Sequence, residues 1–306
     1  MSKIIKATAP AKVNLVFEVG GIQPDGYHPV NSLFLALNLR EELTLVNGET
    51  GTGVSIYVHG QSLPERHIQA VPTDETNLVY KVAQALASHH NIPTPDLQVD
   101  ILKRIPVAGG MAGGSSDAAA MLVALNEFLF QEQGIARLST AELAALGAKL
   151  GSDIPFCLYG GLAIGTNRGE QIQELPDLEF ESNWLLCISN QGLSTPLVFH
   201  KFDELSTGNS FNDLGSLRIT SAQELAAVMS NDLEGAALAL IPALAHLKEQ
   251  LEELGALRAM VSGSGPTIAA LFDSAARCHE VVELLKAEGI FALVSTGPSA
   301  GARLES

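Results

Sequence analysis

Apolar and polar residues alternate along residues 11–21, and this pattern predicts a strand that ends in two glycines. One face carries Val13, Leu15, Phe17 and Val19, and the other carries Lys12, Asn14, Val16 and Glu18. Lys12 and Asn14 therefore share the less apolar face. A solvated strand face is the ordinary interpretation of two such residues, but these two stand inside the apolar run APAKVNLVF.

The rest of the N-terminal half is predicted to mix strands and helices. Strands are expected within residues 43–60, on both sides of a glycine-rich connection, and over residues 97–105. Helices are expected over residues 76–90 with Thr76 as the cap, over 116–130, and over 139–151 with Ser139 or Thr140 as the cap and Gly151 at the end.

The pattern changes after residue 152. Residues 153–175 are apolar and rich in turns, which predicts short strands and a hairpin. The remaining expected elements are a buried strand over 183–190, two or three helices over 221–255, a strand–loop–strand unit over 257–272, a helix over 275–289 and a strand over 290–298. Because strands and helices interleave without a regular βαβ rhythm, we predict an α+β fold with a lobe boundary near residues 160–170.

Composition limits the classes of protein that fit. The 306 residues, 46% of them hydrophobic, suffice for one large domain or two lobes. The formal net charge of −16 disfavours a nucleic-acid-binding protein, which needs a basic face, and it also disfavours binding to an anionic membrane surface. An anionic substrate would therefore need a local cluster of positive charge.

The cysteines indicate a reducing compartment. Cys157, Cys187 and Cys278 are far apart, form no CxxC pair and are odd in number, so no disulfide framework is expected. The first ten residues contain no signal-peptide segment, and no stretch reaches the roughly 20 apolar residues of a membrane span. These features predict a cytoplasmic protein.

Residues 103–122, KRIPVAGGMAGGSSDAAAML, place four glycines between a predicted strand and an alanine-rich helix. Glycines let backbone N–H groups approach a phosphate, and the first helical turn carries unpaired N–H groups and about half a positive charge. Ser115 or Ser116 is a candidate helix cap, and Lys103 and Arg104 are candidate cations beside the phosphate. A flexible turn before a capped helix is the alternative. Since the spacing matches neither a P-loop nor a Rossmann motif, the sequence favours a phosphate cradle of another kind.

Two further segments offer groups for chemistry on a phosphate. Asp153 stands between a helix end and an apolar segment. It either caps the next turn or accepts a proton from a substrate hydroxyl, held ionised by Lys12. Residues 261–267, VSGSGPT, form either a plain hairpin or a turn whose N–H groups face a phosphate.

The segment DGYHP, residues 25–29, has the composition of an exposed turn. The alternative is that Tyr27 and His28 present an aromatic ring and a ring nitrogen to a nucleobase. No second histidine or cysteine stands at a ligand spacing, so His28 is not expected to bind a metal.

Together these segments resemble the GHMP kinases, a family of small-molecule kinases. PAKVNL, PVAGGMAGGSSDA and SGSGPT follow the order of that family's three motifs, and the resemblance covers nearly the whole chain. Within the family, PAKVNLVFEVGGIQPDGYHPVNSLF, LGSDIPF and GLSTPLVF are similar to a kinase whose acceptor is a cytidine diphosphate-linked polyol of isoprenoid precursor synthesis. Ala108 and Ala112 stand where the family often has glycine.

The resemblance implies a two-lobed α+β fold. A ribosomal-protein-S5-domain-2-like lobe with the ATP-phosphate loop would occupy residues 1–165, and an α/β sandwich lobe would occupy residues 166–306. ATP is the implied co-substrate, with Mg²⁺ expected to bind through phosphates and water because the sequence offers no metal cage. The implied partners are small molecules rather than nucleic acid or a membrane, and the protein would act as a monomer or homodimer.

The resemblance also implies roles for single residues. Lys12 and Asp153 would form the catalytic pair, in which Asp153 accepts the proton of the acceptor hydroxyl and Lys12 stabilises charge. The implied ATP-binding residues are Asn77, Lys103, Pro106, Val107, Ala108, Gly109, Gly110, Met111, Ala112, Gly113, Gly114, Ser115 and Ser116. The implied acceptor-binding residues are Asn14, Tyr27, His28, Phe199, Ser264 and Gly265. No residue is expected to ligate a metal.

Two other functions stay open at this point. The same fold serves acceptors such as homoserine, mevalonate or phosphomevalonate, but these molecules have no base to stack on Tyr27 and Phe199. A nucleotide-binding sensor without catalysis is the other alternative, and the presence of both Lys12 and Asp153 counts against it.

Overall fold

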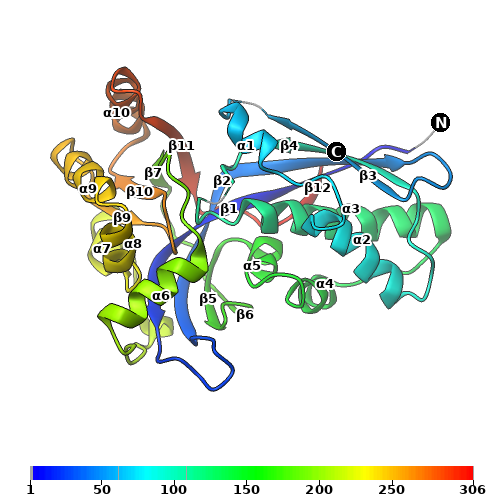
Figure 1. Ribbon diagram of the computed structural model, residues 1–306, viewed down its shortest axis with the longest axis horizontal. Helices are drawn as coiled ribbons and strands as arrows, with labels where there is room; N and C mark the ends of the chain where they lie inside the picture. The colour runs from blue at the N-terminus through cyan, green and yellow to red at the C-terminus, as the bar shows by residue number, and fades with distance from the viewer. Residues whose placement is uncertain (1–2, 61, 108, 306) are drawn as a thin grey trace.

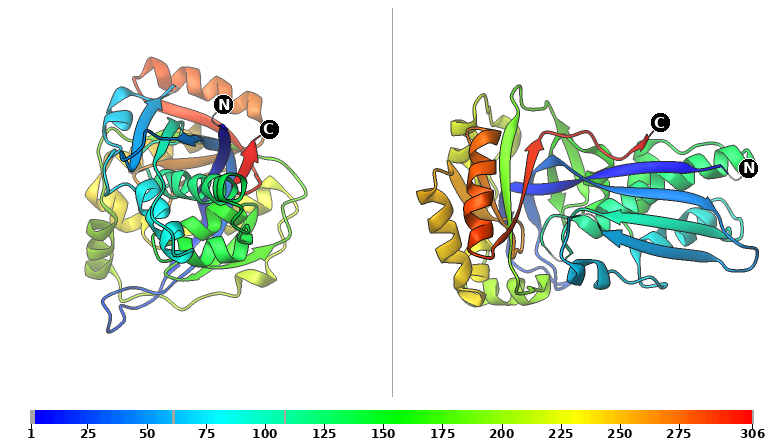
Figure 2. Two further views of the ribbon diagram at one scale, coloured as in Figure 1. Left: turned by 90° about the vertical axis from the view of Figure 1, so that its right-hand side faces the viewer. Right: turned by 90° about the horizontal axis from the view of Figure 1, so that it is seen from above.

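Two β-sheets organise the chain, which the computed structural model describes over residues 3–60, 62–107 and 109–305. The larger sheet occupies one end of the molecule and the smaller sheet the other, with helices packed against each (Figures 1 and 2). Within the described residues the first sheet has eight strands around the order β12-β1-β2-β4-β3, and the second has four in the order β11-β7-β10-β9. The predicted α+β class is confirmed.

Four of the eight described strands of the first sheet come before residue 104, whereas the second sheet is built entirely from the C-terminal half. The first sheet contains β1 (Ile5–Val19), β2 (Val30–Asn47), β3 (Val54–Gly60), β4 (Leu97–Lys103), β5 (Leu162–Asn167), β6 (Gln171–Leu175), β8 (Ser230–Asn231) and β12 (Arg303–Glu305). The second sheet contains β7 (Ser182–Ile188), β9 (Arg258–Val261), β10 (Ile268–Phe272) and β11 (Phe291–Gly297).

The helices fall into two groups in the same way. Those of the first part are α1 (Glu65–Gln69), α2 (Leu78–His89), α3 (Gly113–Gln133), α4 (Thr140–Gly147) and α5 (Ile154–Tyr159). Those of the second part are α6 (Thr195–Leu205), the 3₁₀ turn η1 (Leu214–Ser216), α7 (Ala222–Val228), α8 (Glu234–Leu240), α9 (Ala243–Glu253) and α10 (Ala275–Ala287). None of the helices in the described ranges has both the length and the apolar character that a membrane span requires.

Strands β1 and β2 form a long antiparallel pair whose register shifts twice, at Pro10/Ala11 and at Asn14/Val16. The second shift changes which side chains share a face. Leu15 and Val16 both enter the core between the two sheets, whereas Phe17 packs on the other side of the second sheet. The predicted strict alternation is therefore wrong beyond Asn14, because a bulge inserts one residue into β1.

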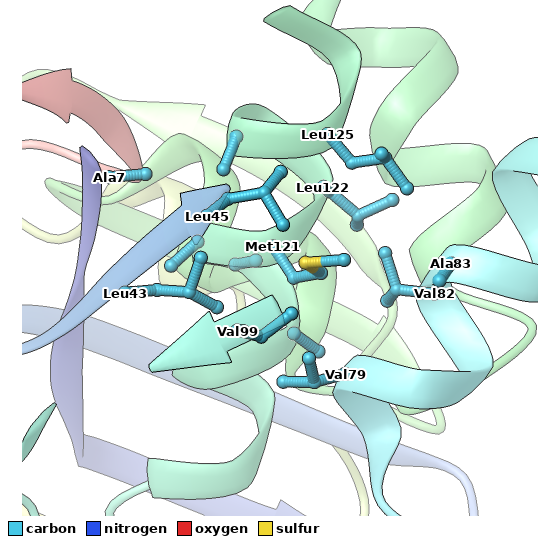
Figure 3. Close-up of a cluster of buried hydrophobic side chains, with 14 of the residues drawn as sticks. Ala7, Leu43, Leu45, Val79, Val82, Ala83, Val99, Met121, Leu122 and Leu125 are labelled. Atoms are coloured by element: carbon cyan, nitrogen blue, oxygen red, sulfur yellow. The ribbon is translucent and has the colours of Figure 1, made fainter. Parts of the chain in front are cut away.

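Helix α3 packs on β1 and β2, and α2 lies beside it. Figure 3 shows the core between these elements, where side chains from the sheet meet side chains from both helices. The labelled residues are Ala7, Leu43, Leu45, Val79, Val82, Ala83, Val99, Met121, Leu122 and Leu125. Residues 118–120 of α3 are alanines with no exposed surface, so short side chains let the helix approach the sheet closely.

The second sheet separates two cores, and the alternation of β7 shows how. Trp184 and Leu186 face the core shared with β1 and β2, whereas Leu185 and Cys187 face the core formed with α8, α9 and α10. All seven residues of β7 are buried, which agrees with the predicted buried strand over 183–190.

Three local predictions are wrong. Helix α2 is capped by Asn77, whose side-chain oxygen accepts the N–H of Val79, and not by Thr76. Helix α3 begins at Gly113 without a side-chain cap, so neither Ser115 nor Ser116 caps it. Residues 154–159 form α5 rather than a strand, because Pro155 in the first turn favours a helix start.

The first sheet also takes in strands from the second half of the chain. The boundary predicted at residue 165 falls inside β5, and the β5–β6 hairpin extends from β2. Near the other end of the chain, β12 pairs with β1. The guanidinium of Arg40 donates to the carbonyls of Ala300 and Gly301, which fastens this returning segment to the first sheet. The division at residue 165 stays a prediction.

Candidate active site

A cleft of about 1300 Å³ lies between the two sheet-and-helix units. Its walls come from β1, the β1–β2 connection, the glycine loop with the start of α3, the α4–α5 turn, the β5–β6 turn, α6 and the β9–β10 turn. Segments that are far apart in sequence therefore meet at one place.

Most of the predicted site residues line this cleft. From the predicted catalytic and acceptor sets they are Lys12, Asn14, Tyr27, His28, Asp153, Phe199, Ser264 and Gly265. From the predicted ATP set they are Gly109, Gly110, Ala112, Gly113, Gly114 and Ser115. Ala108 lies outside the described residues.

The structure does not bring the other predicted ATP residues to the cleft wall. These residues are Asn77, Lys103, Pro106, Val107, Met111 and Ser116. Asn77 is the buried cap of α2. Ser116 is fully buried and donates to the carbonyl of Pro10 at 2.6 Å. Met111 is fully buried in the core between the sheets.

Lys103 belongs to an internal ion cluster instead of the cleft. Its ammonium lies 2.5 Å from Glu41 Oε1 and 2.6 Å from Asp117 Oδ2, and all three side chains are almost fully buried. Glu41 also accepts the backbone N–H groups of Arg104 and Ile105. The positive charge that the sequence assigned to the phosphate is therefore neutralised inside the protein.

The Lys103 cluster has strongly shifted pKa values. Burial raises the pKa of Glu41 to about 8, although the ammonium of Lys103 opposes this shift. Burial also raises the pKa of Asp117. Burial alone would lower the pKa of Lys103, but the two carboxylates outweigh it and the pKa lies above its usual value.

Lys12 and Asp153 meet inside the cleft. Lys12 Nζ lies 4.0 Å from Asp153 Oδ2 and donates to Asn14 Oδ1 at 2.7 Å. Asn14 Nδ2 donates in turn to Ser32 Oγ at 2.8 Å, which fixes the orientation of the amide. The Lys12 side chain is 6% exposed and that of Asp153 is 31% exposed, so the ammonium is held in place while the carboxylate faces the cleft.

Asp153 occupies the N-cap position of α5 but its side chain makes no capping hydrogen bond. The capping interpretation of this residue is therefore wrong. The carboxylate is available to a ligand, because the helix that follows does not use it.

The glycine loop is held in a conformation that needs small residues. Gly110 has φ +72°, and a Cβ there would lie 2.2 Å from the carbonyl oxygen of Ser262. Ala112 has φ +62°, in the left-handed region that favours glycine. The loop contacts β1 directly, because the backbone N–H of Lys12 donates to the carbonyl of Met111.

The first turn of α3 points its backbone into the cleft. Gly113, Gly114 and Ser115 all line the cleft, and no side chain of the described residues caps the helix. The helix is 21 residues long, so the helix dipole places about half a positive elementary charge at its N-terminus. Uncapped N–H groups at such a terminus form an anion-binding site.

The β9–β10 turn closes the cleft beside Lys12. Gly263 has φ +57°, and a Cβ there would lie 3.4 Å from Lys12 Nζ and 3.1 Å from Asn14 Oδ1. Asn231 Nδ2 holds this turn by donating to the carbonyls of Val261 and Gly263, each at 2.8 Å. A side chain at position 263 would therefore crowd the predicted catalytic lysine.

The other end of the cleft is aromatic. The His28 and Phe199 rings are 5.3 Å apart, and Tyr27 is 55% exposed. His28 is fixed at both nitrogens, with Nδ1 2.8 Å from the carbonyl oxygen of Gly20 and Nε2 3.2 Å from Asp203 Oδ1. The Arg168 guanidinium lies 3.7 Å from the centre of the Tyr27 ring.

The cleft wall also contains charged residues that the sequence did not point to: Lys149, Arg168, Glu170 and Asp203. Arg168 lies in the turn of the predicted hairpin, and Lys149 lies just beyond α4 in a segment predicted as helix. Asp203 lies on α6, a helix that the sequence reasoning did not identify. Their sequence neighbourhoods give no sign that they face the cleft, because that depends on how distant segments pack.

The described part of the chain contains no group of three or more His, Cys, Asp or Glu side chains placed to hold a metal ion.

Comparison with known proteins defines the class. The model of the GHMP kinases N terminal domain matches residues 77–161, and that of the GHMP kinases C terminal matches residues 214–290. The chain belongs to the GHMP kinase family, which confirms the resemblance seen in the sequence.

Relatives of similar length sharpen this assignment. A 4-diphosphocytidyl-2-C-methyl-D-erythritol kinase of Rhodococcus jostii (strain RHA1) is 42% identical over 306 residues, which cover 97% of this chain and 93% of that one. The protein of the same name from Salinispora arenicola (strain CNS-205) is 39% identical over 309 residues, which cover 98% of this chain and 94% of that one.

Solved structures share the fold. The crystal structure of a 4-(cytidine 5'-diphospho)-2C-methyl-D-erythritol kinase has a TM-score of 0.67 and 27% identity, covering 97% of this chain and 100% of that chain. The L. major mevalonate kinase in complex with R-mevalonate has a TM-score of 0.70 with 19% identity, covering 98% of this chain and 100% of that chain. The latter similarity concerns the fold alone.

Proposed function

We propose that this chain is an ATP-dependent kinase that phosphorylates the 2-hydroxyl of 4-diphosphocytidyl-2-C-methyl-D-erythritol. The products would be the 2-phosphate and ADP, in the methylerythritol phosphate route to isoprenoid precursors. The assignment is supported by relatives of that name at about 40% identity over nearly the whole chain. The observation that carries the chemistry is the Lys12–Asp153 pair, 4.0 Å apart, in one cleft with an uncapped helix N-terminus.

Asp153 is proposed to accept the proton of the attacking hydroxyl. Phosphoryl transfer needs little covalent chemistry from the protein, so in-line placement, charge stabilisation and a base are the main contributions. The Lys12 ammonium, held by Asn14, would stabilise the developing oxygen charge beside Asp153. The acceptor hydroxyl would contact both groups, which lie 4.0 Å apart on the cleft wall.

The glycine loop and the first turn of α3 are proposed to bind the ATP phosphates. Gly109, Gly110 and residues 112–115 line the cleft on this side. ATP-bound Mg²⁺ would neutralise phosphate charge during the transfer. We propose Mg²⁺ held by phosphate oxygens and water, because the described side chains form no metal cage.

The aromatic end of the cleft is proposed to bind the cytosine. Tyr27 and Phe199 offer ring faces, and His28 offers a ring nitrogen if a base edge displaces Asp203. Ser264 and Gly265, in the turn beside Lys12, are proposed to border the acceptor phosphates.

Replacing Tyr27 by alanine tests the acceptor end. Stacking of one base is worth about 1–3 kcal/mol, so we expect Tyr27→Ala to raise KM for the cytidyl acceptor about tenfold and leave KM for ATP unchanged. Steady-state kinetics with each substrate varied will measure both. Tyr57→Ala is the matched control, because Tyr57 is 50% exposed on β3 and lies outside the cleft. Equal losses for both substrates would place Tyr27 elsewhere.

The assay that tests the function measures ADP release with purified protein, ATP and Mg²⁺. We expect rapid release with the diphosphocytidyl acceptor and little with homoserine, mevalonate or phosphomevalonate, which lack a base for Tyr27 and Phe199. Faster turnover of one of those acceptors would overturn the assignment. ATP binding without acceptor-dependent ADP release would instead indicate a nucleotide sensor.

We also propose a cytoplasmic protein that acts as a monomer or homodimer and has no nucleic-acid partner. All three cysteines are free and buried, which suits a reducing compartment. The net charge of −16 opposes nucleic-acid binding.

A further inference from the structure

The cleft needs positive charge that the predicted cations do not supply. Lys103 is buried with two carboxylates, and Arg104 pairs with Glu42 at 3.2 Å, and neither of them lines the cleft. Among the described wall residues, the lysines and arginines are Lys12, Lys149 and Arg168. These three must oppose two polyphosphates in a protein with a net charge of −16.

Two of the three wall cations are already engaged. Lys12 donates to Asn14 and faces Asp153. Arg168 pairs with Asp25 at 3.0 Å and stacks on Tyr27, at the aromatic end of the cleft. Lys149 is exposed, and its ammonium makes no hydrogen bond or ion pair with the part of the chain that the structure describes. Of the three described wall cations, Lys149 is therefore the one whose charge is not shared with any described protein group.

Lys149 stands on the wall that faces the start of α3. The segment from Ala148 to Asp153 lines the cleft without a break. Within it, a Cβ at Gly151 would lie 3.8 Å from Ser115 Oγ in the first turn of α3. Lys149 precedes Gly151 by two residues and Asp153 by four. Its flexible four-carbon stem can therefore carry the ammonium into the space between the helix terminus and the carboxylate.

We propose that Lys149 binds the polyphosphate of the nucleotide from the segment between α4 and α5, beside the first turn of α3. The proposal rests on the proposed function in so far as ATP occupies this cleft. An ammonium is a point charge that can contact phosphate oxygens in many orientations. This suits a polyphosphate, because its charge distribution changes during phosphoryl transfer. Lys149 takes over the role that the sequence assigned to Lys103.

The test measures binding of the β,γ-imido analogue of ATP and of adenosine by titration calorimetry, without acceptor. We expect Lys149→Met to weaken binding of the imido analogue by about five- to tenfold, as loss of one charge-assisted contact does, and to leave adenosine binding unchanged. Lys149→Arg should retain most of the affinity. The affinity of Lys149→Met should also depend less on salt concentration.

The matched control is Lys81→Met, since Lys81 is exposed on α2 and does not line the cleft. Unchanged affinity of Lys149→Met for the imido analogue, or an equal loss for adenosine, would overturn the proposal. The calorimetry contains no acceptor, so its result does not depend on which acceptor the enzyme uses. If the wild-type protein binds the imido analogue but does not phosphorylate the cytidyl acceptor, only the proposed acceptor is overturned. A wild-type protein that binds neither ligand would overturn both.

Discussion

Two buried lysines near the glycine loop have opposite roles. Lys12 is 5% exposed and Lys103 is 1% exposed, and the sequence assigned both to the chemistry of phosphate transfer. Lys103 contacts two carboxylates at 2.5 and 2.6 Å, whereas Lys12 contacts one amide at 2.7 Å and one carboxylate at 4.0 Å. The charge of Lys103 is neutralised by two carboxyl groups inside the protein, whereas the charge of Lys12 can act on a ligand in the cleft.

The comparison shows that burial alone does not identify a functional lysine. A buried ammonium must be compensated, and full compensation by carboxylates makes it a structural element. In the Lys103 cluster, the groups that Lys103 and Glu41 contact belong to β2, the end of β4 and α3. This ion cluster therefore fixes the segment that leads into the glycine loop. Lys12 and Asp153 differ from this cluster because both line the cleft, and they lie 4.0 Å apart instead of in close contact.

The largest expected effect is on the Lys12–Asp153 pair. We expect Asp153→Asn to lower kcat by about 10²–10⁴-fold, the range for loss of a general base, with little change in KM for ATP or in thermal stability. Single-turnover kinetics and a melting curve will measure these quantities. Asp100→Asn, on β4 outside the cleft, is the control. Unchanged turnover in Asp153→Asn would remove this residue from the role of base.

The second test exchanges the two lysines for methionine. Lys103→Met leaves the buried carboxyl groups of Glu41 and Asp117 without their cation, so we expect a loss of about 3–5 kcal/mol in the free energy of unfolding. Lys12→Met removes one hydrogen bond, so about 1 kcal/mol is expected there, together with a large fall in kcat. Urea unfolding and kinetics on both variants give the two quantities. A similar loss of stability in the two variants would contradict the view that Lys103 is structural and Lys12 functional.

The smallest effect is a pH dependence of stability. The pKa of Glu41 is raised from an ordinary value of 4.5 to about 8, so between these pH values the folded protein holds a proton that the unfolded chain has lost. Stability from this group is therefore complete at low pH and falls by up to about 1.4 kcal/mol per pH unit as the pH rises towards 8.

Glu41→Gln should remove this contribution. Urea unfolding of wild type and variant at pH 5.5, 6.5 and 7.5 will give the difference between the two, which isolates Glu41 from other titrating groups. Among those, burial lowers the pKa of His67 and raises that of Asp117, with opposite effects on the slope. Parallel stability curves for the two proteins would show that Glu41 keeps its ordinary pKa.

The sequence predicts those parts of the site that depend on local backbone. The glycines of residues 109–114 and the turn at 261–267 line the cleft as expected, because tight turns and helix starts are encoded by adjacent residues. Period-two alternation also placed Lys12 and Asn14 together, and the bulge that breaks this alternation comes only after Asn14.

What the sequence does not predict depends on partners far along the chain. Lys103 does not line the cleft, because its ammonium forms an ion pair with Glu41, which lies 62 positions earlier and next to it across the β2–β4 pair. The hydroxyl of Ser116 donates a hydrogen bond to the carbonyl of Pro10 and so does not face the cleft. Helix α6, which carries Phe199, starts with Thr195 and Pro196 in a segment without a clear helical pattern. Packing, rather than local propensity, decides these cases.

Strand β1 bears Lys12 and Asn14, and β2 covers one of its edges. Its other backbone contacts come from later segments: β12 at Lys6–Thr8, Met111 at Lys12 and β8 at Val16–Phe17. During synthesis the ribosome makes β1 first and its last partner almost 300 positions later. Long-range pairing of this kind forms slowly. Strand β1, which carries Lys12, therefore has all these neighbours only after β12 has emerged from the ribosome, about 300 positions after β1 itself.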